Sequence, residues 1–139
     1  MLIDTDGRRL VEEGQPVAIL VVDDEPGVLA VVRRCLDDQR VTLIEASCGR
    51  DALELIMVGP ALDLLITDLR MPEMQGDELA RQVLAVEPDV KVLYLTSHAD
   101  RLFETRPQLS LKEAYLDKPF TREGLREAVA LLLLGRRRF

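Results

Sequence analysis

Five apolar, strand-like segments alternate along this chain with amphipathic segments, and this alternation limits the possible folds more than any other feature. The first, residues 17–22 (VAILVV), is rich in β-branched residues and has no polar position. Continuous apolar runs of this kind are typical of strands that are covered on both faces. The other expected strands lie at residues 41–46, 62–67, 90–95 and 114–116.

Helical spacing fills the intervals between these strands. One face of the first expected helix is formed by Val28, Val32, Cys35 and Leu36. Pro26 suits the start of that helix, and Thr121 is a good N-cap for the last one. The connections are too short for anything but crossover units, and right-handed crossovers give a parallel sheet with helices on both faces. The sequence therefore predicts an α/β fold of the (βα)₅ type.

Residues 99–112 are the part of the chain where the pattern is least regular. Leu102 and Phe103 suggest a helix, but Pro107 would cost about 3 kcal/mol in a helix interior. We expect a short or broken helix in this segment.

One domain is expected, because 139 residues suit a single hydrophobic core. We assign it to residues 17–135, where the alternating pattern runs. Residues 1–16 are rich in charge without a clear period, and we interpret them as a partly disordered lead-in. Residues 136–139 are interpreted as a basic tail.

Composition and charge exclude several classes of partner. The formal net charge is −7, from 18 basic and 25 acidic residues, whereas nucleic-acid binding needs a basic face. The longest apolar run, residues 129–134, is far below the roughly 20 residues of a membrane span, and nothing resembles a signal peptide. Cys35 and Cys48 lack metal-site spacing and suit a reducing compartment. We therefore expect a cytoplasmic protein without membrane or direct nucleic-acid contact.

Complementary polar side chains stand at the ends of four expected strands. They are Asp23, Asp24, Asp68, Thr96 and Lys118. In an open parallel sheet the carboxyl ends of the strands share one edge, and ligands bind in the crevice outside it. Taken singly, each residue has an ordinary structural explanation, such as helix capping or a loop lysine. Together they would bring three carboxylates, a hydroxyl and an ammonium to one edge.

Such a set has a definite chemistry. Three carboxylates held together repel each other, and a divalent cation relieves that repulsion. Mg²⁺ prefers octahedral oxygen ligands and keeps several waters. The predicted edge can therefore hold a divalent cation and receive a phosphoryl group.

Four ordered motifs also resemble one family. They are VVDDEP at residues 21–26, TDLRMPEMQG at 67–76, LTS at 95–97 and DKPF at 117–120. Together they resemble the receiver domain of two-component response regulators, over nearly everything after residue 16. The resemblance implies a flavodoxin-like, three-layer (βα)₅ sandwich with strand order 2-1-3-4-5.

The resemblance implies a role for each acidic residue. Asp24 and Asp68 would be direct ligands of Mg²⁺ (or Mn²⁺), together with the backbone carbonyl of Arg70, and Asp23 would act through a water. Asp68 would also be the phosphoacceptor, attacking phosphorus to form an acyl phosphate. Residues two beyond the phosphoacceptor and two beyond the threonine, Arg70 and His98, would tune the lifetime of that bond.

Further roles follow from the same resemblance. Lys118 would neutralise phosphoryl charge, and a cis peptide bond at Pro119 would aim it inward. Thr96 would donate a hydrogen bond to the phosphoryl group, and Tyr115 would turn inward as the switch. A static, half-buried aromatic is the alternative for Tyr115, and an exposed loop residue is the alternative for His98.

One face departs from the family pattern. Receivers commonly carry Gly-Ala shortly before the switch aromatic, where this chain has SLKEA at residues 110–114. Pro107 also falls where the fourth helix is expected. The catalytic residues thus match the family, while the surface that binds partners or forms a homodimer differs from it.

The leading interpretation is a phosphoacceptor signalling domain, not a turnover enzyme. Its donor would be a histidine kinase or a histidine phosphotransfer protein, and its target a downstream protein. A pseudo-receiver that binds partners without phosphorylation is one alternative, and the receiver portion of a larger hybrid histidine kinase is another. A phosphohydrolase of the haloacid-dehalogenase type is disfavoured, because that class carries its nucleophile after the first strand. A flavodoxin is disfavoured too, because no Ser/Thr/Gly-rich loop follows that strand.

Overall fold

The computed structural model describes residues 16–97, 102–104 and 108–134. Within them, a five-stranded parallel sheet has the order β2-β1-β3-β4-β5, which confirms the predicted topology. The strands are β1 (Val17–Val22), β2 (Val41–Ala46), β3 (Leu64–Asp68), β4 (Lys91–Thr96) and β5 (Glu113–Asp117).

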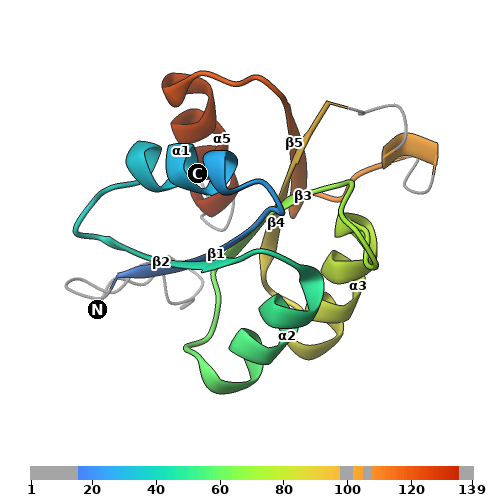
Figure 1. Cartoon of the computed structure of the whole chain (residues 1–139). Coiled ribbons are helices and arrows are strands. Elements are labelled where there is room, and N and C mark those ends of the chain that lie inside the picture. Colours follow the sequence, from blue (N-terminus) through green and yellow to red (C-terminus); the bar gives the residue numbers. More distant parts are fainter. Residues whose placement is uncertain (1–15, 98–101, 105–107, 135–139) are drawn as a thin grey trace.

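Helices cover both faces of this sheet, so the domain has three layers (Figure 1). The helices are α1 (Pro26–Cys35), α2 (Gly49–Val58), α3 (Gly76–Val86) and α5 (Arg122–Leu134). In Figure 1, α1 and α5 lie on one face, and α2 and α3 lie on the other. No helix in the described part of the chain has the length and apolar content needed to cross a bilayer.

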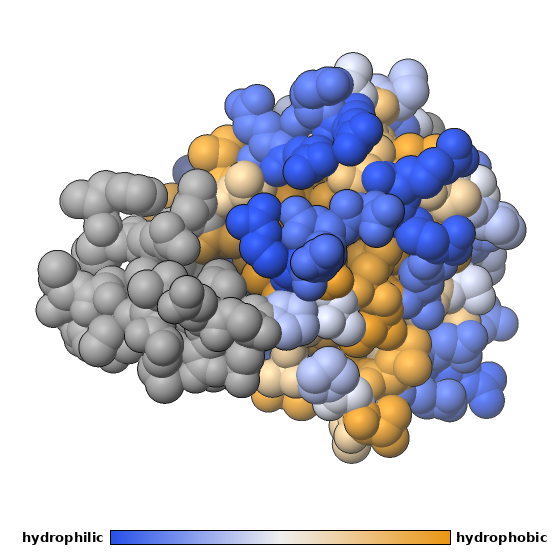
Figure 2. All heavy atoms as spheres, turned by 90° about the vertical axis from the view of Figure 1, so that its left-hand side faces the viewer, coloured by the Kyte–Doolittle hydropathy of each residue, from blue (hydrophilic) through white to orange (hydrophobic). Residues whose placement is uncertain are grey.

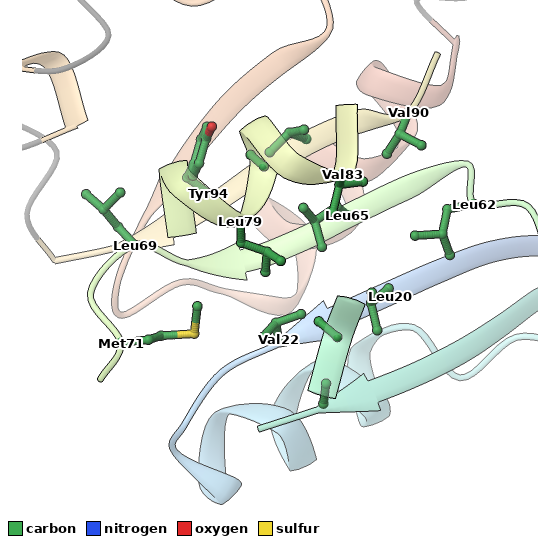
Figure 3. Packing of buried hydrophobic residues seen from close by; sticks show 14 of the residues in the cluster. Leu20, Val22, Leu62, Leu65, Leu69, Met71, Leu79, Val83, Val90 and Tyr94 are labelled. Carbon is green, nitrogen blue, oxygen red and sulfur yellow. The ribbon is translucent and has the colours of Figure 1, made fainter. Parts of the chain in front are cut away.

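Alternation along the buried strands divides the core into two clusters. Ile19 and Val21 of β1 pack on the face of α1 and α5, whereas Leu20 and Val22 pack on the face of α2 and α3. Figure 3 shows the second cluster, in which Leu79 of α3 lies over the sheet. Successive strand side chains point to opposite faces, so a wholly apolar strand supplies both cores at once.

Helix starts follow the local sequence. Pro26 is the first residue of α1, as predicted, and the Thr121 hydroxyl accepts the Gly124 N–H at 2.9 Å before α5. The start of α2 is less expected, because the Cys48 thiol accepts the Asp51 N–H at 3.4 Å.

Three strands differ in extent from the prediction, and β4 lies one residue later than expected. Strand β3 begins two residues later than expected, because the Asp63 carboxylate, rather than a backbone carbonyl, accepts the Ala18 N–H at 2.9 Å. Strand β5 runs from Glu113 to Asp117, one residue longer at each end than expected, and both added residues are charged. Glu113 is nevertheless buried, and its carboxylate accepts a hydrogen bond from the Tyr94 hydroxyl at 3.2 Å.

The irregular segment between β4 and β5 is described only in part. Residues 102–104 form one helical turn. Pro107 and His98 lie outside the described residues. The lead-in up to residue 15 and the basic tail at 136–139 also lie outside them, so these predictions stay predictions.

Candidate functional site

The strand-end residues meet at the carboxyl edge of the sheet. Asp68 is the last residue of β3 and Thr96 the last of β4, while Asp23 directly follows β1. Strands β1 and β3 are paired neighbours, and the Lys118 N–H donates to the Thr96 carbonyl at 3.0 Å. Residues almost a hundred positions apart are therefore brought together.

Asp23 is held in place from three sides. Its side chain is fully buried, and its N–H donates to the Ala46 carbonyl at 3.2 Å. One carboxylate oxygen accepts the Glu25 N–H at 2.9 Å, and the other accepts a hydrogen bond from Lys118 Nζ at 3.0 Å. These contacts fix the carboxylate at the entry to α1.

Lys118 joins two of the three carboxylates. Its Nζ lies 3.0 Å from Asp23 Oδ2 and 3.3 Å from Asp68 Oδ1, and its side chain is only 15% exposed. Charge-assisted contacts of this kind are strong in a low-dielectric environment. One ammonium faces two buried carboxylates, so negative charge remains in excess.

The pKa values of both groups reflect this crowding. Burial raises the pKa of the Asp68 carboxyl above its usual range, and the charge of Asp23 raises it further, although the charge and hydrogen bond of Lys118 act in the opposite direction. Burial by itself lowers the pKa of Lys118, but the hydrogen bonds and charges of Asp23 and Asp68 together outweigh it, and the net shift is upward. The Lys118 ammonium therefore stays charged, whereas burial and repulsion from Asp23 disfavour the charged form of Asp68.

The same carboxylates can hold a metal ion. Asp23, Asp24 and Asp68 each offer an oxygen, and the three oxygens lie within 4.8 Å of one another. Asp24 is exposed, whereas Asp23 and Asp68 are buried, so the cluster opens to solvent on one side. Hard oxygen donors are the ligands that Mg²⁺ and Mn²⁺ prefer, and the donor set therefore fits the predicted cation.

The backbone beneath Asp68 is held by residues that the sequence analysis gave no role. The Thr67 hydroxyl donates to the Asp68 carbonyl at 2.9 Å. Gly76, the first residue of α3, packs so closely that a Cβ there would collide with the same carbonyl oxygen. Its N–H also donates to the Leu69 carbonyl at 2.7 Å. The only sign of this close approach in the sequence was Gly76 itself, which ends the motif at residues 67–76.

The structure also describes three other predicted residues. Arg70 is exposed in the loop after β3, and the Lys118–Pro119 peptide bond is cis. Tyr115 is 39% exposed on β5, and its ring meets Phe103 edge-on with centroids 5.5 Å apart.

Comparison with known sequences gives a consistent family. Residues 19–130 match the model of the response regulator receiver domain. The chain is 36% identical over 119 residues to the response regulator MprA of Mycolicibacterium vanbaalenii, covering 85% of this chain and 51% of that protein. It is 32% identical over 116 residues to the sensor kinase CckA of Brucella abortus, covering 83% and 12% respectively. The chain thus spans about half, or far less, of these curated relatives.

Solved structures agree with the sequence comparison. A response regulator receiver protein from Sinorhizobium medicae superposes with a TM-score of 0.78 at 29% identity, covering 90% of this chain and all of that one. A receiver domain protein from Clostridium thermocellum gives a TM-score of 0.75 at 26% identity, covering 86% and 96%. With the matching family model and the matching fold, the chain belongs to the response regulator receiver domain family.

Proposed function

We propose that this receiver domain accepts a phosphoryl group on Asp68 from a phosphohistidine, and that the acyl phosphate then switches a surface for a downstream protein. The donor would be a histidine kinase or a histidine phosphotransfer protein. One observation supports this most: Lys118 Nζ lies between Asp23 and Asp68, at 3.0 and 3.3 Å. That arrangement places the Lys118 ammonium beside the nucleophilic carboxylate, at the edge where three carboxylates lie close together.

The transfer is a simple displacement. A carboxylate oxygen of Asp68 forms a bond to phosphorus while the phosphorus–nitrogen bond to the donor imidazole breaks, and the nitrogen keeps the electron pair. Such transfer depends mainly on positioning and charge neutralisation. Lys118 supplies positive charge beside Asp68, and the Thr96 hydroxyl donates to a phosphoryl oxygen.

Asp24 and Asp68 would bind Mg²⁺ or Mn²⁺ directly, with the backbone carbonyl of Arg70, and Asp23 would do so through a water. When bound, the cation neutralises charge on the phosphoryl oxygens and relieves repulsion among the carboxylates. The buried Asp23 and Asp68 keep fixed positions, while the exposed Asp24 faces the solvent from which the ion would come.

The output of the switch would pass through Thr96 and Tyr115. Tyr115 is exposed on β5 beside Phe103, and a change in its position would alter the surface around it. A downstream protein, or a second copy of the domain, would bind that surface. Arg70 and His98 would control access of hydrolytic water and so the lifetime of the phosphoryl group.

The domain would assist its own phosphorylation and hydrolysis without turning over a separate substrate. We place it in the cytoplasm, where free thiols such as Cys35 and Cys48 stay reduced.

A single labelling experiment tests the proposal. The chain is incubated with Mg²⁺ and a small-molecule phosphodonor such as acetyl phosphate, and the added phosphate is located by mass spectrometry. We expect one phosphoryl group on Asp68 that is absent from Asp68→Asn and from samples treated with EDTA. Thr96→Val is a useful second variant, because it removes one hydroxyl and leaves the carboxylates in place.

Other outcomes favour other functions. A folded chain that stays unlabelled under conditions that label ordinary receivers is a pseudo-receiver. Steady multiple turnover of a phosphoester identifies a phosphohydrolase.

A further inference from the structure

A groove lies at the edge of the sheet where β2 has no neighbouring strand. It has a volume of about 780 Å³ and is lined by Leu29, Glu45, Ala46, Ser47, Asp51, Glu54, Leu55 and Val58. These residues belong to α1, the end of β2, and α2. Figure 2 shows this side of the molecule, where an apolar band runs between polar side chains.

Helix α2 presents a second face toward this groove. Asp51, Glu54, Leu55 and Val58 recur at i, i+3, i+4 and i+7, which places them on one side of the helix. The side of α2 that faces the core carries the fully buried Ala52, and Leu55 lies at the border between the two sides. Leu55 is partly buried and packs against the core, whereas Val58 is 84% exposed, so the domain covers this apolar pair only in part.

The rim of the groove is acidic. Glu45 is paired with Arg33, whose Nε lies 2.6 Å from the carboxylate. Asp51 and Glu54 are exposed and form no salt bridge with any residue in the described ranges. They stand one helical turn apart beside an apolar floor that includes Leu29 and Leu55.

We propose that this groove binds a basic amphipathic helix of a partner protein. The partner would place apolar side chains against Leu29, Leu55 and Val58, and arginine or lysine against Asp51 and Glu54. In helix-in-groove recognition the bound helix lays apolar anchors at i, i+3, i+4 and i+7 into the groove, and opposite charges on the rim add specificity and speed of association. A second copy of the chain fits less well, because its net charge is −7.

The groove is separate from the phosphoacceptor cluster but connected to it. None of the cluster's charged residues lines the groove. Two backbone hydrogen bonds link them, from the Asp23 N–H to the Ala46 carbonyl at 3.2 Å and from the Leu29 N–H to the Glu25 carbonyl at 3.3 Å.

The test is a nuclear magnetic resonance titration of the labelled full chain with two synthetic peptides. Both are amphipathic helices with leucine at i, i+3, i+4 and i+7, and their flanking residues are arginine in one and glutamate in the other. We expect the arginine peptide to shift the signals of α2 and the end of β2, and to bind about tenfold or more tightly than the glutamate peptide.

Substitutions distinguish binding in the groove from non-specific charge attraction between the peptide and the protein. Glu54→Gln combined with Asp51→Asn should weaken binding of the arginine peptide about fivefold or more, as should Val58→Ser. Matched controls are Glu127→Gln on α5 and Val86→Ser on α3, which change exposed residues outside the groove and should leave binding unchanged. A melting curve for each variant checks that it is folded.

Three results would overturn the proposal. They are equal binding of the two peptides, signal shifts centred outside α1, β2 and α2, and unchanged affinity in the groove variants. Sedimentation of the chain alone supplies a fourth. Dimerisation that is lost in Val58→Glu would mean that a second copy covers the groove.

Discussion

The two edges of the sheet use carboxylates in opposite ways. At the amino edge, the Asp63 carboxylate accepts a hydrogen bond from the Ala18 N–H at 2.9 Å and so satisfies a backbone donor. At the carboxyl edge, Asp68 lies beside Asp23 and shares one ammonium with it, that of Lys118. The first arrangement satisfies a backbone donor, whereas the second leaves negative charge in excess, as the proposed binding of a cation and a phosphoryl group requires.

The difference has a physical cause. At the amino ends of parallel strands, the first N–H groups lack a ladder partner and need an acceptor. Glu87, in a cavity of about 550 Å³ at that edge, meets such a need by accepting the Leu62 N–H at 3.2 Å. At the carboxyl ends the free backbone groups are mostly carbonyls, which cannot donate a hydrogen bond to a carboxylate. We infer that the amino edge contributes stability and that the carboxyl edge gives up stability for chemistry.

The largest expected effect comes from closing the space beneath Asp68. Gly76→Ala places a Cβ on the Asp68 carbonyl oxygen, so backbone must move, and we expect a loss of about 3 kcal/mol or more. Mg²⁺ binding should weaken as well. Gly27→Ala is the matched control, because nothing lies within 4 Å of its added Cβ. Urea unfolding and Mg²⁺ titration measure both, and equal stability of the two variants would contradict the prediction.

The amino edge should respond in stability alone. Asp63→Ala leaves the buried Ala18 N–H without its acceptor, which should cost about 1–3 kcal/mol. Asp63→Asn keeps an acceptor oxygen and should cost less. Phosphorylation of Asp68, measured in folded protein at low temperature, should be unchanged in both. Lost labelling in a folded Asp63 variant would show that the two edges are coupled.

Asp68, the proposed phosphoacceptor, should destabilise the fold. The pKa of Asp68 is raised by burial and by Asp23, so the protonated form stabilises the fold, and that contribution is lost as pH rises through the raised pKa. At neutral pH without Mg²⁺, Asp68→Asn should therefore be about 1 kcal/mol more stable than the natural chain, although it cannot be phosphorylated.

The pH dependence provides the check on this sign. The advantage of Asp68→Asn should shrink as pH falls toward the ordinary carboxyl pKa of about 3.9, where the natural Asp68 is also uncharged. Adding Mg²⁺ should raise the melting temperature of the natural chain more than that of the variant. The account would be contradicted if the stability difference between Asp68→Asn and the natural chain were less favourable to the variant at pH 7 than at pH 4.

The smallest effect concerns backbone strain at the carboxyl edge. Glu73, in the loop between β3 and α3, has a φ of 69°, which non-glycine residues adopt at some cost. Glu73→Asn should stabilise the chain by about 0.5 kcal/mol, because asparagine tolerates this region better. Glu73→Gln removes the charge but keeps the strain, so its unfolding midpoint should equal that of the natural chain. A gain in both variants would instead indicate a charge effect.

Much of the fold could be predicted because its signals are local. The uninterrupted apolar run of β1 and the proline at the start of α1 lie in the sequence itself. The start of β3 could not be predicted, because the Asp63 side chain replaces a backbone acceptor for a residue 45 positions away. The burial of Glu113 likewise depends on the Tyr94 hydroxyl of a neighbouring strand. Polarity alone gives no sign of such a partner.

The same division holds for the candidate site. The residue types and their positions at strand ends predicted which side chains meet, since parallel strands align their carboxyl ends. Neither the Thr67 hydroxyl on the Asp68 carbonyl nor the close approach of Gly76 could be predicted. Both depend on where the loop after β3 returns to the sheet.

By itself the sequence determined the alternating fold, its family resemblance and the set of charged groups at one edge, because periodicity and residue type are properties of short segments. Only the tertiary structure decided that Lys118 bridges Asp23 and Asp68. It also decided that a groove with an acidic rim and an apolar floor lies between α2 and the end of β2. Distances between side chains and the exposure of a helix face depend on how distant segments pack, and packing is decided by the whole chain at once.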